Sequence, residues 1–199
     1  IIVRLKGGDP MMFGRADEEI QALKKAGIEV EVVPGITAAL AGAAAIGQSL
    51  TLRGVSRSVA FVTLAQGTEN LDPTNTQQPI QNPQADTLVY YMGRKDAAKI
   101  AKQLIEASNN HHKDTPVQIL EAVSTKRERL WSSTLEELAA GRAEDWFDSN
   151  SPALIMVGEA LREKYQTTAN QSENLQCSSA KIDDSLQDGF ILANGRRSA

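Results

Sequence analysis

Short apolar segments alternate with helical patterns along the chain, and this alternation limits the possible folds more than any other feature. Residues 1–5 have the apolar pattern of a strand, a helix is predicted over 17–26, and residues 28–33 return as a strand. Acidic residues open the helix and lysines close it, as the helix dipole favours, and Gly27 suits the position just past its end. This strand–helix–strand order predicts parallel strands joined by a right-handed crossover.

The rest of the chain continues the α/β alternation. Strands are predicted at 59–64, 87–92, 116–120 and 154–157, and helices at 37–46, 95–107 and 134–140. The last of these helices begins with a capping box formed by Thr134 and Glu137. The polar stretch at 66–86, rich in Gln, Asn and Pro, predicts a disordered insertion rather than a lid.

These patterns divide the chain into two α/β domains and a tail. Residues 1–54 are expected to form the C-terminal part of a first, parallel-sheet domain, and residues 55–164 a second α/β domain. Residues 165–199 are polar and nearly aperiodic, which predicts a disordered tail. Because the chain opens with Ile1 inside a predicted strand, we expect the first domain to be incomplete.

Composition and charge exclude several classes of protein. The net charge of −4 argues against a general nucleic-acid binder. The single cysteine, Cys177, rules out an intrachain disulfide, and the adjacent His111 and His112 are expected on a solvated surface rather than at a metal. The uncharged stretch at 32–52 is alanine-rich and broken by a Pro-Gly pair, which predicts a buried helix rather than a membrane span. We expect a protein of the cytoplasm or an organelle stroma.

Two glycine-containing loops follow the first two predicted strands. The first is Gly7-Gly8-Asp9-Pro10 and the second is Pro34-Gly35-Ile36-Thr37. The carboxyl ends of neighbouring parallel strands lie at one edge of a sheet, so we expect these loops to share a pocket. Glycine permits close backbone approach, and Asp9 offers acceptors to a ribose hydroxyl or an ammonium group. Alone, Gly-Gly-Asp-Pro is more typical of a tight turn than of a ligand site. It matches neither the G-x-G-x-x-G dinucleotide fingerprint nor a Walker A loop.

Two features leave structural and functional interpretations open. The alanine-rich helix at 37–46 suits either tight packing on a sheet or the close approach of a ligand. Arg53 and Arg57 would either bind carboxylates through bidentate hydrogen bonds or belong to a solvated linker. The sequence contains no Ser-His-Asp or Cys-His set, which indicates chemistry carried by a bound cofactor or an activated substrate.

An ordered series of motifs resembles the tetrapyrrole methylase family, in particular its uroporphyrinogen-III C-methyltransferases, over about residues 1–164. The series is Val3-Arg4-Leu5-Lys6-Gly7-Gly8-Asp9-Pro10, Phe13-Gly14-Arg15, Glu18-Glu19, Val32-Val33-Pro34-Gly35-Ile36-Thr37-Ala38-Ala39, Arg53-Gly54, Tyr91-Met92-Gly93, Pro116-Val117 and Pro152-Ala153-Leu154-Ile155-Met156-Val157-Gly158. No single motif is specific to this family, whereas the order in which they follow one another is.

The resemblance implies a two-domain α/β methylase fold, a homodimer, and S-adenosylmethionine as the methyl donor bound between the domains. It implies C-methylation of uroporphyrinogen III towards precorrin-2, in sirohaem and cobalamin synthesis. Carried over by position, the donor-binding residues are Gly7, Gly8, Asp9, Met12, Thr37, Ala38, Met92 and Val123. The strand start at Pro152-Ala153-Leu154 would line the adenosine side. Candidates for binding the substrate carboxylates are Lys6, Arg15, Arg53 and Arg57.

The sequence also departs from the family pattern. Relatives carry Gly or Ala where Val123 stands, and histidines where Leu52 and Gln66 stand. Two alternatives to uroporphyrinogen methylation therefore remain: a truncated or degenerate subunit without catalysis, and a sister methylase acting on a later precorrin. A methylase of the same fold acting on RNA or on a protein histidine fits the acidic charge less well.

Overall fold

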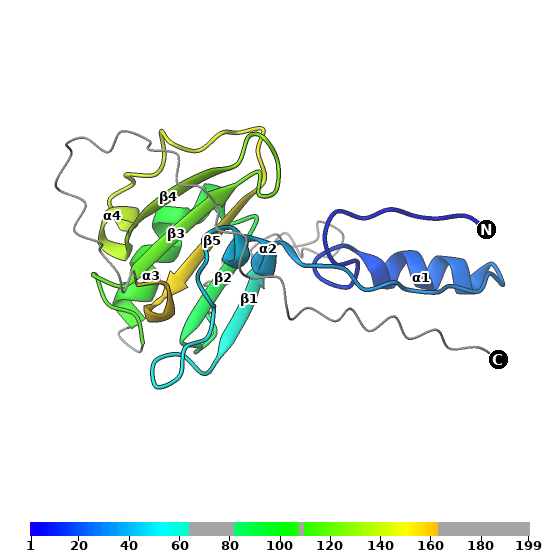
Figure 1. The fold of residues 1–199 in the computed structure, drawn as a ribbon, viewed down its shortest axis with the longest axis horizontal. Helices are drawn as coiled ribbons and strands as arrows, with labels where there is room; N and C mark the ends of the chain where they lie inside the picture. The colour runs from blue at the N-terminus through cyan, green and yellow to red at the C-terminus, as the bar shows by residue number, and fades with distance from the viewer. Residues whose placement is uncertain (64–81, 108–109, 163–199) are drawn as a thin grey trace, which may run out of the picture. The chain divides into compact units, whose positions relative to one another are not determined.

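A five-stranded mixed sheet forms the centre of the computed structural model, which describes residues 1–63, 82–107 and 110–162 (Figure 1). The strand order is β1-β2-β5-β3-β4. The strands are β1 (Val59–Thr63), β2 (Thr87–Tyr91), β5 (Ala153–Gly158), β3 (Pro116–Glu121) and β4 (Arg129–Thr134). β1 and β2 run parallel, and every other neighbouring pair is antiparallel.

Helices cover both faces of this sheet. α3 (Ala97–Ala107) and α4 (Leu135–Ala139) pack on one face, over a core that includes Leu88, Ile119 and Ile155. α2 (Ala38–Ala45) packs on the other face, against alternate residues of the same strands. With both faces covered, β2, β3 and β5 are buried along nearly their whole length, and β2 and β5 accordingly have mostly apolar sequences.

α2 packs closely on the sheet because its contact face is made of small residues. Ala39, Gly42 and Ala43 are its buried positions. A Cβ atom on Gly42 would lie 2.7 Å from the Met156 methyl group and 3.4 Å from a Leu154 methyl group. The alanine-rich sequence therefore serves tight helix-on-sheet packing, one of the two interpretations that the sequence left open.

Most predicted elements are confirmed, as is the α/β fold class. α1 (Ala16–Lys25) matches the first predicted helix, and Gly27 follows it with a left-handed φ of +73°. One half of the predicted capping box is present, since Thr134 Oγ1 accepts a hydrogen bond from the Glu137 N–H at 3.4 Å, whereas the Glu137 carboxylate pairs with Arg142. The sequence did not predict β4, an edge strand whose largely exposed residues include a run of Ser and Thr that reads as loop.

Two predicted strands are wrong. Residues 1–5 and 28–33 are not strands in the structure, and their apolar side chains are largely exposed. A strand is stabilised by the hydrogen bonds of a neighbouring strand, and none pairs with either segment among the described residues. Apolar composition alone therefore did not produce the predicted strand–helix–strand unit.

The described helices also bear on the uncharged stretch at 32–52. It contains α2, which is eight residues long. Within the described ranges, no helix combines the length and apolarity needed to cross a membrane. The predicted insertion at 66–86 falls mostly, and the predicted tail entirely, outside the described residues, and the domain boundaries stay predictions.

His111 corrects a second expectation, since it is buried rather than solvated. Only 5% of its surface is exposed, and Nε2 lies 3.0 Å from the Ala85 carbonyl oxygen. Its Nδ1 is buried and has no hydrogen-bond partner in the described part of the chain. Burial lowers the pKa of the His111 imidazole, against an opposing effect of the Ala85 carbonyl. The neighbouring His112 is exposed.

We predict that His111 makes the fold acid-sensitive. The unfolded imidazole takes up a proton near its usual pKa of about 6.5, whereas the folded one does so only at lower pH. The free energy of unfolding should therefore fall as the pH drops below that value. Urea unfolding at about pH 7.5 and about pH 5.5 measures this fall. His111→Gln should reduce the fall and His112→Gln should preserve it; an equal fall in both variants would contradict the prediction.

Candidate functional site

The two glycine-containing loops touch each other, although the strands predicted before them are absent from the structure. Asp9 Oδ2 accepts a hydrogen bond from the Gly35 N–H at 2.9 Å, and Oδ1 accepts one from the Met11 N–H at 2.8 Å. A Cβ on Gly35 would lie only 2.5 Å from the Gly8 carbonyl oxygen. Glycine at position 35 therefore allows a backbone contact that any side chain would block.

Tyr91, at the end of β2, joins these loops to the sheet. Its hydroxyl lies 2.6 Å from Thr37 Oγ1 and accepts the Ala39 N–H at 3.0 Å. Thr37 makes no side-chain cap of its own helix, so the Tyr91 oxygen satisfies one of the free N–H groups at the start of α2. The Tyr91 ring also packs edge-on against Phe13 of the first loop, with centroids 4.8 Å apart.

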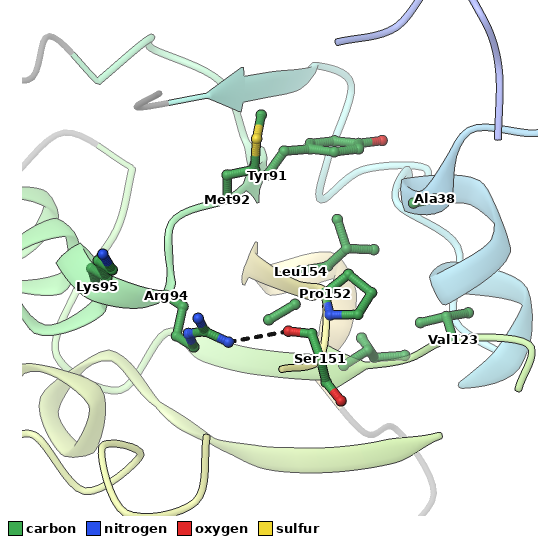
Figure 2. A pocket seen from close by; sticks show the side chains of 11 residues that line it. Ala38, Tyr91, Met92, Arg94, Lys95, Val123, Ser151, Pro152 and Leu154 are labelled. Carbon is green, nitrogen blue, oxygen red and sulfur yellow. Dashed lines mark hydrogen bonds between the residues drawn. The ribbon is translucent and has the colours of Figure 1, made fainter. Parts of the chain in front are cut away.

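A cavity of about 380 Å³ opens beside this junction (Figure 2). Its lining is mostly apolar, which is usual for a site that holds a small molecule. The lining residues are Ala38, Tyr91, Met92, Arg94, Lys95, Leu120, Val123, Ser151, Pro152, Ala153 and Leu154. They come from the start of α2, the carboxyl ends of β2 and β3, where ligands bind in α/β sheets, and the start of the antiparallel β5.

The structure brings together only part of the predicted donor site. Ala38, Met92 and Val123 line the cavity, together with the predicted strand start at Pro152-Ala153-Leu154. Gly7, Gly8, Asp9, Met12 and Thr37 do not line it. Thr37 nevertheless bonds to the lining residue Tyr91, and Phe13 of the first loop packs against that ring.

Two lining segments leave their strands through left-handed residues. Met92 follows β2 with a φ of +56°, and Ala122 follows β3 with a φ of +49°. Each such conformation costs a non-glycine residue about 1–2 kcal/mol. Strained residues of this kind concentrate where a backbone is shaped for function. Here the two turns direct Met92 and Val123 to the cavity.

The four predicted substrate-binding cations are not gathered at the cavity. Lys6 Nζ lies 2.7 Å from Glu19 Oε1, and Arg15 pairs with Glu18. The hydrogen bond from Lys6 lowers the pKa of the Glu19 carboxyl, and the Arg15 guanidinium does the same for Glu18.

Arg53 and Arg57 are exposed, in the connection between α2 and β1. The Arg57 N–H donates to Asp86 Oδ2 at 2.9 Å, next to the start of β2. That is the opposite end of β2 from Tyr91 and the cavity. The binding roles of all four cations stay predictions.

Sequence reasoning did not predict Arg94 and Ser151 as site residues. Arg94 directly follows the Tyr91-Met92-Gly93 motif, which was the only signal for it. Its guanidinium reaches carbonyl groups about 55 residues further along the chain, and no sequence pattern reveals such a contact. No group of three metal-ligating side chains occurs among residues 1–63, 82–107 and 110–162.

Comparison with known families decides the membership of this chain. The family model "Tetrapyrrole (Corrin/Porphyrin) Methylases" matches residues 2–139. The chain belongs to the tetrapyrrole methylase family. This confirms the resemblance drawn from the ordered motifs.

Curated tetrapyrrole methylases extend the similarity beyond the family model. Over 164 residues the chain is 42% identical to the uroporphyrinogen-III C-methyltransferase of Pseudomonas aeruginosa, covering 81% of this chain and 63% of that protein. It is 41% identical to the siroheme synthase of Pseudomonas fluorescens, covering 82% of this chain but 34% of the relative. The chain thus spans less than two thirds of either relative.

Solved tetrapyrrole methylases share the fold. The native uroporphyrin III C-methyl transferase of Thermus thermophilus matches with a TM-score of 0.66 at 36% identity, over 81% of this chain and 64% of that one. A structure of this enzyme complexed with S-adenyl homocysteine matches with a TM-score of 0.64 at 37% identity, over 80% of this chain and 66% of that one.

We predict that Asp9 holds the two loops together. Asp9→Ala removes the acceptor of the Gly35 and Met11 N–H groups, and losing such bonds costs about 1–3 kcal/mol. Exchange of these two amide hydrogens should speed up by roughly tenfold or more, which NMR hydrogen exchange measures. Glu31→Ala, at an exposed carboxylate on the approach to the second loop, is the control. Unchanged exchange in Asp9→Ala would show that the carboxylate does not hold the loops.

Proposed function

We propose that this chain is the donor-binding part of a uroporphyrinogen-III C-methyltransferase. It would transfer methyl groups from S-adenosylmethionine to pyrrole carbons, towards precorrin-2 in sirohaem and cobalamin synthesis. The observation that carries the proposal is the cavity, because Ala38, Met92, Val123 and Pro152 line it. These are positions that the family resemblance assigns to the donor. The relatives named for this reaction, one of them solved with S-adenyl homocysteine, support it.

The residues present fit such a donor. A cavity of about 380 Å³ lies within the usual size range of small-molecule sites. Its apolar walls suit an adenine ring and the methylene groups beside the sulfonium, and Met92 offers a polarisable side chain that adapts to them. When bound, S-adenosylmethionine supplies a methyl group activated on a sulfonium. Because displacement at that carbon depends on alignment, we expect the chain to act mainly by orienting the two reactants.

The glycine-containing loops complete the proposed donor site. Gly8 has a left-handed φ of +94°, and its Cβ position lies 3.4 Å from the Ile36 carbonyl. The close contact is at Gly35, whose Cβ position lies 2.5 Å from the Gly8 carbonyl oxygen; a loop held in this way is preorganised, which lowers the entropic cost of binding. We propose that Gly7, Gly8, Asp9, Met12 and Thr37 contact the donor from this side. Lys6, Arg15, Arg53 and Arg57 remain the proposed partners of the substrate carboxylates, and a homodimer the proposed assembly.

A sister reaction is the second candidate. The cobalt precorrin-4 methyltransferase CbiF matches with a TM-score of 0.63 at 26% identity, over 78% of this chain and 63% of that one. Under this second candidate, the same cavity would serve methylation of a later precorrin. Methyl-transfer assays with uroporphyrinogen III and with a precorrin, run in parallel, distinguish the two substrates.

The proposal is tested by the binding of S-adenosylhomocysteine, measured by isothermal titration calorimetry. We expect the 199-residue chain to bind it with a dissociation constant on the order of micromolar. Val123→Phe fills part of the cavity and should weaken binding by about tenfold or more. Val55→Phe, at an exposed position, should leave it unchanged.

Three outcomes of this test differ in meaning. Absence of binding by the unaltered chain would overturn the proposed donor site. Equal weakening by both valine variants would place the ligand elsewhere. Binding without methyl transfer to either substrate would identify a donor-binding subunit that lacks catalysis.

A further inference from the structure

Arg94 connects the Tyr91-Met92-Gly93 motif to the opposite wall of the cavity. It lies in the 3-10 helix η2 (Arg94–Asp96), directly after the turn that carries Met92. Its guanidinium donates to three backbone carbonyls of one loop: Nη1 to those of Asp148 and of Ser151 at 3.1 Å, and Nη2 to that of Ser149 at 3.0 Å. Figure 2 shows the bond to Ser151 at the cavity's edge.

The loop that Arg94 holds forms a wall without regular secondary structure. Residues 148–152 precede β5, and Ser151 and Pro152 line the cavity. A loop of this kind lacks the hydrogen-bond ladder of a strand or helix. Backbone bonds run from the Ser151 N–H to the Asp148 carbonyl at 3.2 Å and from the Ala122 N–H to the Pro152 carbonyl at 3.0 Å, and side chains add the remaining contacts that hold the loop.

Glu121 fixes the same loop from the other side. Its side chain is fully buried, and Oε1 accepts the Asp148 N–H at 2.9 Å. Oε2 pairs with Arg129, which also donates to the Trp146 carbonyl at 2.7 Å and lies over the Trp146 ring at 4.5 Å. Asp148 is thus bound at its N–H by Glu121 and at its carbonyl by Arg94.

We propose that Arg94 is a positioning residue that holds the 148–152 wall in the shape that receives the methyl donor. This inference rests on the proposed function and adds a role for Arg94. The planar guanidinium presents several donors in a fixed fork, so one side chain binds three carbonyls at once. A lysine ammonium is a point charge on a flexible stem and would not reproduce this geometry.

Arg162 provides a matched control. It follows β5 and η3 (Glu159–Leu161), donates to the Asp114 carbonyl at 3.0 Å and pairs with Glu159. Like Arg94, it joins two distant segments through a backbone carbonyl, but it does not line the cavity. Arg162→Met therefore reports the cost of losing such a link away from the proposed donor site.

The test has a ligand-free arm and a ligand arm. Without ligand, Arg94→Met should speed amide exchange at Ser151, whose N–H donates to the Asp148 carbonyl, by about tenfold or more. With S-adenosylhomocysteine, calorimetry well below each melting temperature should show an affinity about tenfold weaker for Arg94→Met, with Arg94→Lys intermediate. Arg162→Met should change neither quantity, even where it lowers the melting temperature.

The outcomes separate this inference from the proposed function. If the unaltered chain does not bind S-adenosylhomocysteine, the proposed function is overturned, and the ligand role of Arg94 with it. If the unaltered chain binds S-adenosylhomocysteine and Arg94→Met binds it equally well, the inference about Arg94 is overturned and the proposed function stands. Equal loss of affinity in Arg162→Met also overturns it, since the effect would then follow general destabilisation. In a methyl-transfer assay, a positioning role predicts a higher KM for the donor with kcat nearly unchanged.

Discussion

The site depends on one phenol oxygen, that of Tyr91. It lies 2.6 Å from Thr37 Oγ1 and 3.0 Å from the Ala39 nitrogen, so it binds the chain on both sides of Ala38. Because Tyr91 ends β2, this contact fixes the start of α2 against the sheet. The Asp9–Gly35 bond then adds the first loop to the second. The order of these contacts explains why segments far apart in the sequence meet at one cavity.

A second set of contacts shapes the facing wall. Here the loop before β5 is held through its backbone, by Arg94 at its carbonyls and by the buried Glu121 at the Asp148 N–H. A buried carboxylate is stable only when it is paired and hydrogen-bonded, as Glu121 is with Arg129. The cavity is thus bounded on one side by a helix fixed by a neutral hydroxyl and on the other by a loop fixed by charged groups.

The sequence predicted the elements with strong local signals and missed those set by distant partners. α1 and α2 were predictable because each ends at a glycine with positive φ, and the central strands because both of their faces are buried. The segments at 1–5 and 28–33 have strand-like composition but no pairing partner in the described chain. The sequence around His111 did not indicate that the residue is buried, and the sequence around Arg94 did not indicate its contacts with the loop before β5. The ordered motifs identified the family, whereas the contacts that shape the cavity required the fold.

We expect the two glycine-containing loops and the lining residues at the strand ends to bind one donor molecule together. The direct measurement is an NMR titration with S-adenosylhomocysteine that follows the Gly8 and Thr37 amides and the Met92 and Val123 methyl groups. We expect all four signals to shift with a single dissociation constant. Shifts at Met92 and Val123 alone, or two different constants for the loop amides and the methyl groups, would contradict this account.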